Sequence, residues 1–324
     1  MTAGYFASRA IVRSSRKIDL KDKTILITGG SRGLGLALAR QLADMHAKIV
    51  ICARDEEELR KAGDELSYYT SNFLAIPCDV ADQEQVKSMM QEIREKMGTI
   101  DILINNAGII QAGPMEQMKK EDYEQAMNVH YWGPFHTTSE ALKYMFEKGE
   151  GRIVNIVSIG GKLSFPHLLP YNASKYALSG FSEGLAAELG RYNIRVTTVY
   201  PGLMRTGSAR NIEAKGSHED EYVWFKTSGH LPLLTVGADK AARKIIKAMR
   251  VGKKTLTLTI PAKLGKIVSE AAPDLTISFF DLINRLLPES ESGGEQSKTG
   301  DEIRKEKSET AFAKPKSTGK NPEA

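Results

Sequence analysis

Short apolar runs alternate along the chain with longer segments whose apolar residues recur at helical spacing. Seven runs are only a few residues long and almost continuously apolar, which is typical of parallel strands buried on both faces of a sheet. The expected strands are Thr24–Thr28, Lys48–Ala53, Phe73–Cys78, Ile100–Ile104, Arg152–Val157, Ile194–Val199 and Thr255–Ile260. The expected helices are Leu34–His46, one that begins at Asp55, Gln83–Met97, Glu121–Phe146, Ala173–Gly190 and Asp239–Val251. This order predicts a doubly wound α/β fold, with a seven-stranded parallel sheet flanked by helices.

The two ends of the chain differ in composition from this alternating middle. Residues 1–19 carry four basic residues and no acid before Asp19, and they lack the apolar core and cleavage site of a secretory signal. We interpret them as a solvated basic arm, with a transit peptide or a segment on an anionic membrane surface as alternatives. Residues 288–324 hold 7 Lys/Arg and 8 Asp/Glu among Ser, Gly and Pro. They offer too little apolar surface to offset conformational entropy and are predicted to form a disordered tail, which leaves 20–287 as a single domain.

Two stretches within this domain carry apolar residues where loops are usually polar. The first, about 203–236, includes Trp224 and Phe225. It is interpreted equally as a lid over a bulky hydrophobic substrate and as a local core or subunit interface. The second, about 263–287, has the amphipathic pattern of a C-terminal helix. Packing against the domain is the default expectation for this helix, and pairing with a second subunit or lying on a membrane are the alternatives.

Composition and charge narrow the classes of function. Hydrophobic residues make up 41% and charged residues 26% of the chain, which is ordinary for a soluble globular protein, and no apolar run reaches the roughly 18 residues that span a bilayer. The net charge of +5 is spread along the chain, which argues against a nucleic-acid-binding protein. Cys52 and Cys78 lie in expected strands and are predicted to be core residues, and no Cys/His spacing indicates a metal site. We expect a cytoplasmic protein, with peripheral membrane contact left open.

A glycine-rich turn follows the first expected strand and leads directly into a helix. It reads T-G-G-S-R-G-L-G. Glycines permit a tight turn and let backbone N–H groups approach a pyrophosphate, and the helix N-terminus adds further donors. This context predicts a Rossmann-type dinucleotide site, whereas the nucleophile elbow that G-x-S-x-G also matches needs an earlier strand for its oxyanion hole. The turn residues expected at the cofactor are Thr28, Gly29, Ser31, Arg32, Gly33, Leu34 and Gly35.

Two arginines near the expected adenosine ribose favour NADP(H) over NAD(H). An NAD site usually carries an acid after the second strand, but this chain has Arg54 there and Arg32 in the glycine turn. Guanidinium groups bind a 2′-phosphate in bidentate fashion. Asp79, followed by Val80 after the third strand, is expected either to accept from the adenine amino group or to cap the next helix.

A serine, a tyrosine and a lysine carry the candidate chemistry. Ser158 ends the fifth expected strand, and Tyr171 and Lys175 are four residues apart, so a helix places both on one face. A phenol with a pKa of about 10 is a poor acid at neutral pH. A nearby cation lowers that pKa, so Lys175 is predicted to make Tyr171 a usable proton donor. His167 is interpreted as structural or pocket-lining, because no carboxylate lies at an obvious partnering distance in the sequence.

With these residues in place, the chain resembles the short-chain dehydrogenases/reductases over about residues 20–260. The motifs are the glycine turn, N-N-A-G at 105–108, Asn128, Ser158, Tyr171-x3-Lys175 and Pro201-Gly202. The resemblance implies that Tyr171 donates or accepts the proton and that Ser158 polarises the carbonyl. It also implies that Lys175 holds the nicotinamide ribose and that Asn128 holds a water that relays protons. Further cofactor contacts implied by the resemblance are Asn106, Ala107, Gly108, Pro201, Gly202 and Thr206.

The sequence therefore predicts an NADP(H)-dependent oxidoreductase that interconverts a ketone and a secondary alcohol on a hydrophobic small molecule, as a homo-oligomer. Two alternatives stay open. A keto-lipid reductase at a membrane surface would share the chemistry and differ in substrate and location. A non-catalytic NADP-binding interaction module would need none of Ser158, Tyr171 and Lys175.

Overall fold

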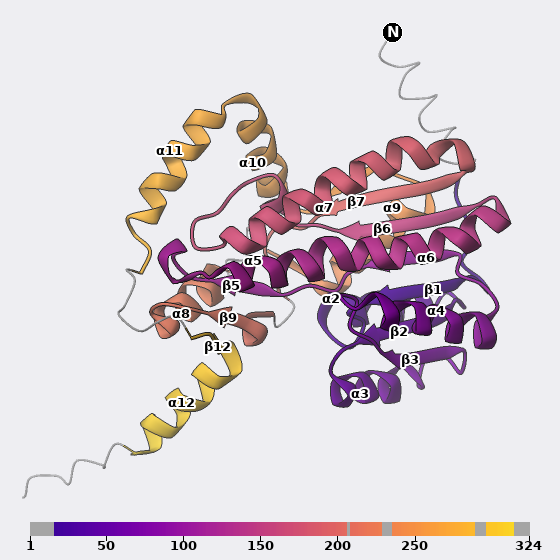
Figure 1. Cartoon of the computed structure of the whole chain (residues 1–324), viewed down its shortest axis with the longest axis horizontal. Coiled ribbons are helices and arrows are strands. Elements are labelled where there is room, and N and C mark those ends of the chain that lie inside the picture. The colour runs from indigo at the N-terminus through magenta and orange to yellow at the C-terminus, as the bar shows by residue number, and fades with distance from the viewer. Residues whose placement is uncertain (1–15, 206–207, 229–234, 289–295, 314–324) are drawn as a thin grey trace, which may run out of the picture.

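The computed structural model describes residues 16–205, 208–228, 235–288 and 296–313. Its centre is a parallel sheet of seven strands, in the order β11-β7-β6-β4-β1-β2-β3, and this confirms the expected doubly wound Rossmann-like fold (Figure 1). The strands are β1 (Thr24–Thr28), β2 (Lys48–Ala53), β3 (Phe73–Pro77), β4 (Ile102–Asn105), β6 (Gly151–Ile156), β7 (Ile194–Tyr200) and β11 (Thr255–Thr257). The strand order reverses between β1 and β4, and the carboxyl ends of these strands therefore open into a crevice that can hold a ligand.

Helices cover both faces of the sheet, because its strands are apolar on both faces. Ile25 and Ile27 of β1 pack toward one helical layer, and Leu26 between them packs toward the other. The first layer consists of α2 (Gly33–Ala43), α3 (Glu56–Leu66) and α9 (Ala238–Arg250). The second consists of α4 (Gln83–Met97), α6 (Gly133–Lys148) and α7 (Leu169–Glu188). Short 3-10 turns lie at Met115–Gln117, Ile159–Gly161, Leu189–Tyr192 and Ser208–Asn211.

The long helix predicted over Glu121–Phe146 is interrupted. The structure has α5 (Lys120–Met127), a wider π-helical turn over Asn128–Trp132, and then α6. The Gly133 N–H donates to the Asn128 carbonyl, five residues back, and Pro134, with no N–H, cannot continue the regular ladder. The turn therefore changes which residues of this segment face the sheet and the cavity, relative to a regular helix.

The N-terminal boundary lies earlier than predicted. The Ile18 N–H donates to the Arg250 carbonyl at 3.0 Å, and Arg152 donates to the Arg16 carbonyl at 3.2 Å. The backbone at Arg16 and Ile18 is therefore hydrogen-bonded to the domain, while the side chains of Arg16, Lys17 and Asp19 are exposed. Residues 1–15 of the predicted arm lie outside the described residues.

The insertion at 203–236 and part of the predicted disordered tail form structure together. Within the insertion are β8 (Met204–Arg205), β9 (Ile212–Ala214) and α8 (His218–Ser228), while β10 (Val236–Gly237) pairs with β8. A small second sheet joins β9 to β5 (Ile110–Ala112) and to β12 (Lys298–Thr299), which leads into α12 (Gly300–Ala313). The prediction of disorder is therefore wrong for 296–313, because β9 pairs with β12 and a small apolar cluster takes in Ile303. Residues 289–295 and 314–324 lie outside the described residues.

Ile303 gives this correction a measurable consequence. Its side chain is 3% exposed and packs in a cluster with Ala112, Leu168 and Ile212. Ile303→Ala is expected to destabilise the protein by about 2–4 kcal/mol, the usual cost of truncating a buried isoleucine. Chemical denaturation would measure it, with Lys305→Ala on the same helix as the control. An Ile303→Ala protein as stable as the original would mean that α12 does not dock.

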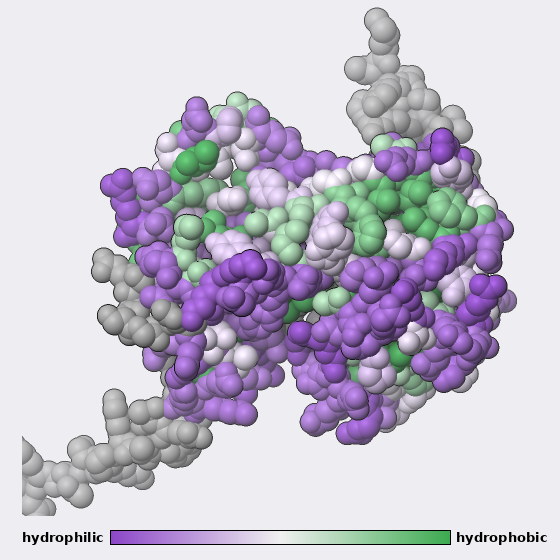
Figure 2. All heavy atoms as spheres, in the orientation of Figure 1, coloured by the Kyte–Doolittle hydropathy of each residue, from purple (hydrophilic) through white to green (hydrophobic). Residues whose placement is uncertain are grey.

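The predicted C-terminal apolar helix is two helices, α10 (Ile260–Ala271) and α11 (Pro273–Asn284), because Pro273 begins a new helix. They arch away from the main body beside the carboxyl ends of the strands (Figure 1). Much of their apolar surface is exposed, as at Leu264, Leu275 and Leu282, and hydrophobic side chains are visible on this arch in Figure 2. No helix within the described ranges is both long and apolar enough to cross a membrane.

Candidate active site

A cavity of about 1550 Å³ opens at the carboxyl ends of the central strands. The glycine turn and the residues after β2 and β3 line one part of it, and Ser158, Tyr171 and Lys175 line another. A third part is apolar, with walls from the loop before α7, from α8 and from α10–α11. The cavity therefore has room for an extended dinucleotide together with an apolar small molecule.

At the glycine turn, the lack of side chains lets neighbouring backbone segments approach one another closely. Gly29 has φ +62°, and a Cβ there would lie 2.8 Å from the Ala107 Cα. A Cβ on Gly35 would lie 2.1 Å from the Gly29 carbonyl oxygen. α2 begins at Gly33, and the N-cap residue Arg32 makes no side-chain capping bond to it, so the first N–H groups of the helix are available to an anion. The turn therefore fits a pyrophosphate.

The N-N-A-G segment is bound to this turn. Thr28 Oγ1 accepts from the backbone N–H groups of Asn106 and Ala107, both at 3.0 Å. The Asn106 amide donates to the carbonyls of Thr28 and Gly29 at 3.0 and 2.9 Å. Asn106 thus holds the glycine turn in shape, and Ala107 and Gly108 form the adjoining cavity wall.

Both arginines of the NADP prediction line the cavity, but each faces an acid. Arg32 pairs with Glu58 through contacts of 2.5 and 2.7 Å. Burial raises the pKa of Glu213, and the charge of the exposed Arg54 opposes this rise. The two guanidinium groups lie beside the expected adenosine site, and Glu58 is an acidic neighbour that the sequence analysis missed, 26 residues from Arg32.

Asp79 does not cap α4. Asp82 caps that helix by accepting from the N–H groups of Glu84 and Gln85, while Asp79 accepts from the Ala81 N–H at 3.0 Å. Asp79 and Val80 both line the cavity. The predicted capping role of Asp79 is therefore wrong, and its role at the adenine stays a prediction.

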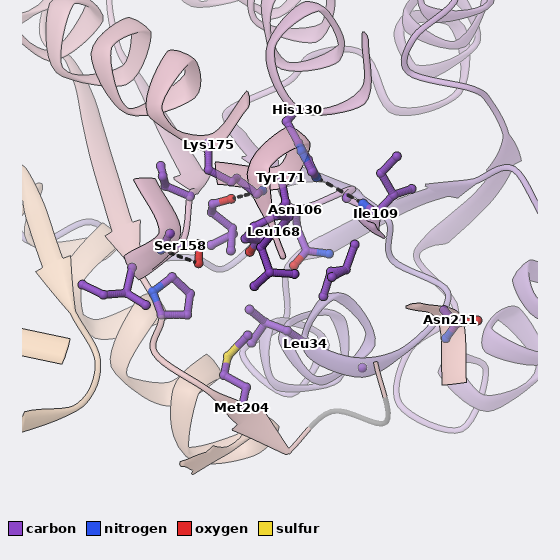
Figure 3. Close-up of a pocket in the computed structure, with 18 of the residues that line it drawn as sticks. Leu34, Asn106, Ile109, His130, Ser158, Leu168, Tyr171, Lys175, Met204 and Asn211 are labelled. Atoms are coloured by element: carbon purple, nitrogen blue, oxygen red, sulfur yellow. Dashed lines mark hydrogen bonds between the residues drawn. The ribbon is translucent and has the colours of Figure 1, made fainter. Parts of the chain in front are cut away.

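Ser158, Tyr171 and Lys175 meet in the cavity, as Figure 3 shows. Ser158 follows β6 and accepts from the Gly160 N–H at 2.9 Å. One turn further along α7, Lys175 donates to the Ile156 carbonyl at 3.1 Å, and its Nζ lies 5.8 Å from the centroid of the Tyr171 ring. Pro201 and Gly202 line the same cavity after β7, and Thr206 lies outside the described residues.

Burial dominates the titration of this group. Burial raises the pKa of Tyr171, and the hydrogen bond to Ser158 lowers it by less. Burial also lowers the pKa of Lys175 to about 7. Lys175 was expected to lower the pKa of Tyr171, but that pKa is raised, and only the hydrogen bond to Ser158 opposes the effect of burial.

Asn128 is not brought to the cavity. It is exposed at the start of the π-helical turn, and the residue of this turn that reaches the catalytic group is His130, which is buried and lies beside Tyr171 and Lys175 (Figure 3). The expectation that Asn128 holds a relay water has no support in this arrangement. A prediction of one regular helix over residues 121–146 does not indicate which of the two residues faces the cavity.

His167 has a carboxylate partner. Its Nδ1 lies 2.5 Å from Glu221 Oε1 of α8, and both side chains are buried. The pair joins the loop that leads to Tyr171 to the inserted segment. Glu221 was not predictable as a partner because it lies 54 residues from His167 in the sequence. His167 precedes Leu168, which forms part of the cavity wall.

The fold and the cavity together define a nucleotide-binding oxidoreductase of the Rossmann type. A family model described as "short chain dehydrogenase" matches residues 23–216. The chain belongs to the short-chain dehydrogenase/reductase family, as the resemblance of its motifs implied.

Individual relatives agree with this assignment. The chain is 38% identical over 189 residues to granaticin polyketide synthase putative ketoacyl reductase 1 of Streptomyces violaceoruber, covering 58% of this chain and 70% of the relative. It is 31% identical over 258 residues to dehydrogenase/reductase SDR family member 7B of Danio rerio, covering 77% and 81%. The structure of actinorhodin polyketide ketoreductase with NADPH superposes with a TM-score of 0.65 at 30% identity, covering 73% of this chain and 95% of the other.

Proposed function

We propose that this protein is an NADP(H)-dependent oxidoreductase that interconverts a hydrophobic ketone and its secondary alcohol. The observation that carries the proposal is the meeting of Ser158, Tyr171 and Lys175 in the cavity that the glycine turn also lines. The names of two similar proteins, a ketoacyl reductase and a ketoreductase crystallised with NADPH, support it. A nucleotide-binding module without catalysis would have no use for a partly buried tyrosine beside a buried lysine at this place.

The residues have distinct roles in the proposed reaction. Bound NADPH supplies the hydride in the direction of reduction. Ser158 donates a hydrogen bond to the carbonyl oxygen and so stabilises the negative charge that develops there. Tyr171 gives its proton to the same oxygen, and the raised pKa of its buried hydroxyl keeps it protonated at neutral pH. Lys175, in its charged form, stabilises the phenolate left behind and holds the nicotinamide ribose.

A screen of ketones and alcohols, followed by NADPH absorbance, tests the proposal. We expect turnover to increase with the apolar size of the ketone, because Phe165, Trp224 and Phe280 line the apolar part of the cavity. NADPH binding without turnover on any ketone or alcohol would favour the non-catalytic module.

The preference for NADP(H) rests on Arg32 and Arg54, and Arg54→Asp is expected to shift it toward NAD(H). The change removes a partner for the 2′-phosphate and supplies an acceptor for the 2′-hydroxyl. A hydrogen bond to a charged group is worth about 1.5–3 kcal/mol, so the ratio of NADP to NAD affinity should fall by about 10- to 150-fold.

Cofactor titration monitored by protein fluorescence measures this ratio. Arg60→Asp is the matched control, because Arg60 is an exposed arginine of α3 that pairs with Asp64 and is not among the cavity residues. An unchanged ratio in Arg54→Asp would leave the NADP assignment to Arg32 alone.

A membrane-surface reductase is a second candidate, favoured by one observation. α10 and α11 present exposed apolar side chains outward, including Leu275 at 65% exposure, and the same helices line the cavity with Ala262 and Phe280. An apolar substrate could therefore pass from a lipid surface along one continuous apolar path. Co-sedimentation with liposomes tests this candidate. Leu275→Glu should weaken binding, while Tyr68→Glu, at a still more exposed position away from these helices, should not.

We also propose a homo-oligomer formed through α6 and α7. Hydrophobic side chains gather on the surface between these helices (Figure 2), and the exposed aromatic residues there include Phe135, Phe146 and Tyr176. Exposed apolar surface of this kind marks a protein–protein contact. Sedimentation velocity would detect the assembly.

A further inference from the structure

The π-helical turn places a histidine against the catalytic group. His130 is 0% exposed, and its ring lies edge-on to that of Tyr171, with 5.4 Å between centroids and 88° between planes. A Cβ on Gly108 would lie 3.0 Å from His130 Nε2 and 3.7 Å from Lys175 Nζ. Gly108, His130, Tyr171 and Lys175 therefore meet at one point of the cavity wall, and the roles proposed above leave His130 unused.

The hydrogen bonds of His130 determine its tautomer. Nε2 accepts from the Ile109 backbone N–H at 3.1 Å, so it must carry the lone pair. The proton is then on Nδ1, which lies 2.8 Å from Ser174 Oγ and donates to it. The Ser174 hydroxyl in turn donates to the Tyr171 carbonyl at 2.9 Å. With a neutral imidazole, each donor and acceptor in this series of hydrogen bonds has a partner.

The surroundings also keep the ring neutral. Burial is the main cause of a pKa of His130 far below its ordinary value, and the nearby charge of Lys175 adds to the effect. Tyr171 and Lys175 are the titratable groups packed against the ring. A protonated His130 would lose the bond from Ile109 and repel Lys175.

We propose that His130 is a neutral positioning residue for the reaction assigned above. It joins the wall at Gly108–Ile109 to α7 through the chain Ile109–His130–Ser174–Tyr171, and it supports the Tyr171 ring from the side. By this means it fixes the Tyr171 hydroxyl against Ser158 and fixes the wall along which the nicotinamide lies. The inference rests on the proposed function, because it concerns the placement of that proton donor.

Substitutions at His130 and Ser174 test the role. His130→Ala is expected to lower kcat about 100-fold, the loss that a displacement of about 1 Å at a reacting group can cause. KM for the ketone and the affinity for NADPH should change only a few fold. His130→Asn keeps a donor near Nδ1 and His130→Gln keeps an acceptor near Nε2, so each should recover most of the loss and stay within about tenfold of the original.

Two further measurements separate positioning from proton transfer. Ser174→Ala should lower kcat by about tenfold alone and have little further effect in His130→Ala, because both act through one chain. The kcat–pH profiles of the original protein and His130→Asn should have the same shape and differ only in height. An acidic limb that disappears in His130→Asn would show that the imidazole titrates during the reaction, and it would overturn the proposal. A His130→Ala protein with the same kcat as the original protein would also overturn the proposal.

A spectroscopic measurement stands apart from turnover. Nitrogen-15 NMR of the histidine-labelled protein at pH 7 should show His130 as the neutral tautomer protonated on Nδ1, and a tautomer protonated on Nε2 or an imidazolium would overturn the proposal. If no ketone is turned over, the function proposed above fails, and the NMR result then decides alone whether the hydrogen-bond chain exists. If turnover depends on Tyr171 and not on His130, the function stands and this inference fails.

Discussion

Replacing Tyr171 by phenylalanine is expected to abolish turnover while the fold and the cofactor site persist. The hydroxyl is the proposed proton donor, and general acid catalysis contributes about 10²- to 10⁴-fold to a rate. The phenylalanine ring would still fill its place beside His130. The NADPH affinity should therefore stay within a few fold of the original.

Single-turnover assays with NADPH and an accepted ketone would measure the loss. Tyr176→Phe is the matched control, because Tyr176 lies on the same helix but is exposed and is not among the cavity residues. A Tyr171→Phe protein that keeps a rate near the original would remove Tyr171 from the mechanism. It would then direct attention to another proton source in the cavity.

The fold was predictable because its signals are local. The bounds of Thr24–Thr28, Lys48–Ala53 and Gln83–Met97 agree with the structure, since continuous apolar runs and a helix capped by Asp82 are visible in short windows of sequence. Pairing between distant segments was not predictable. The strand Lys298–Thr299 is two residues long, and only its pairing with Ile212–Ala214 gives it structure.

The motif residues of the site were also predictable from the sequence, but their partners from distant segments were not. The glycine turn, Ser158, Tyr171 and Lys175 come together because the carboxyl ends of parallel strands share one edge. Asn128 was placed at the site on resemblance alone, and the π-helical turn brings His130 there instead. Such a turn changes which residue faces the cavity, and no apolar periodicity reveals it. Glu58 and Glu221 were missed because their partners are distant in sequence.

The lysine of the catalytic group is held in the folded protein at a cost in stability. Lys175 is buried with its Nζ bonded to the Ile156 carbonyl, and burial lowers its pKa from 10.5 to about 7. Between these two values the unfolded chain binds a proton that the folded protein does not. The free energy of unfolding therefore rises with pH from about 7 to about 10.5. Below pH 7, burial of Lys175 lowers the free energy of unfolding by its full amount. The difference between the pKa values corresponds to roughly 4–5 kcal/mol.

Lys175→Met is accordingly expected to inactivate the protein and to stabilise it. At pH 7 the variant loses most of the penalty, and leaving the Ile156 carbonyl without its donor costs about 1 kcal/mol. The net gain in the free energy of unfolding should be roughly 2–4 kcal/mol at pH 7, and it should shrink as the pH approaches 10. Urea denaturation of the cofactor-free protein at several pH values measures both effects. Lys143→Met, at an exposed lysine that pairs with Glu140, should show neither. A Lys175→Met protein less stable than the original at pH 7 would mean that the buried lysine contributes more through its contacts than its burial costs.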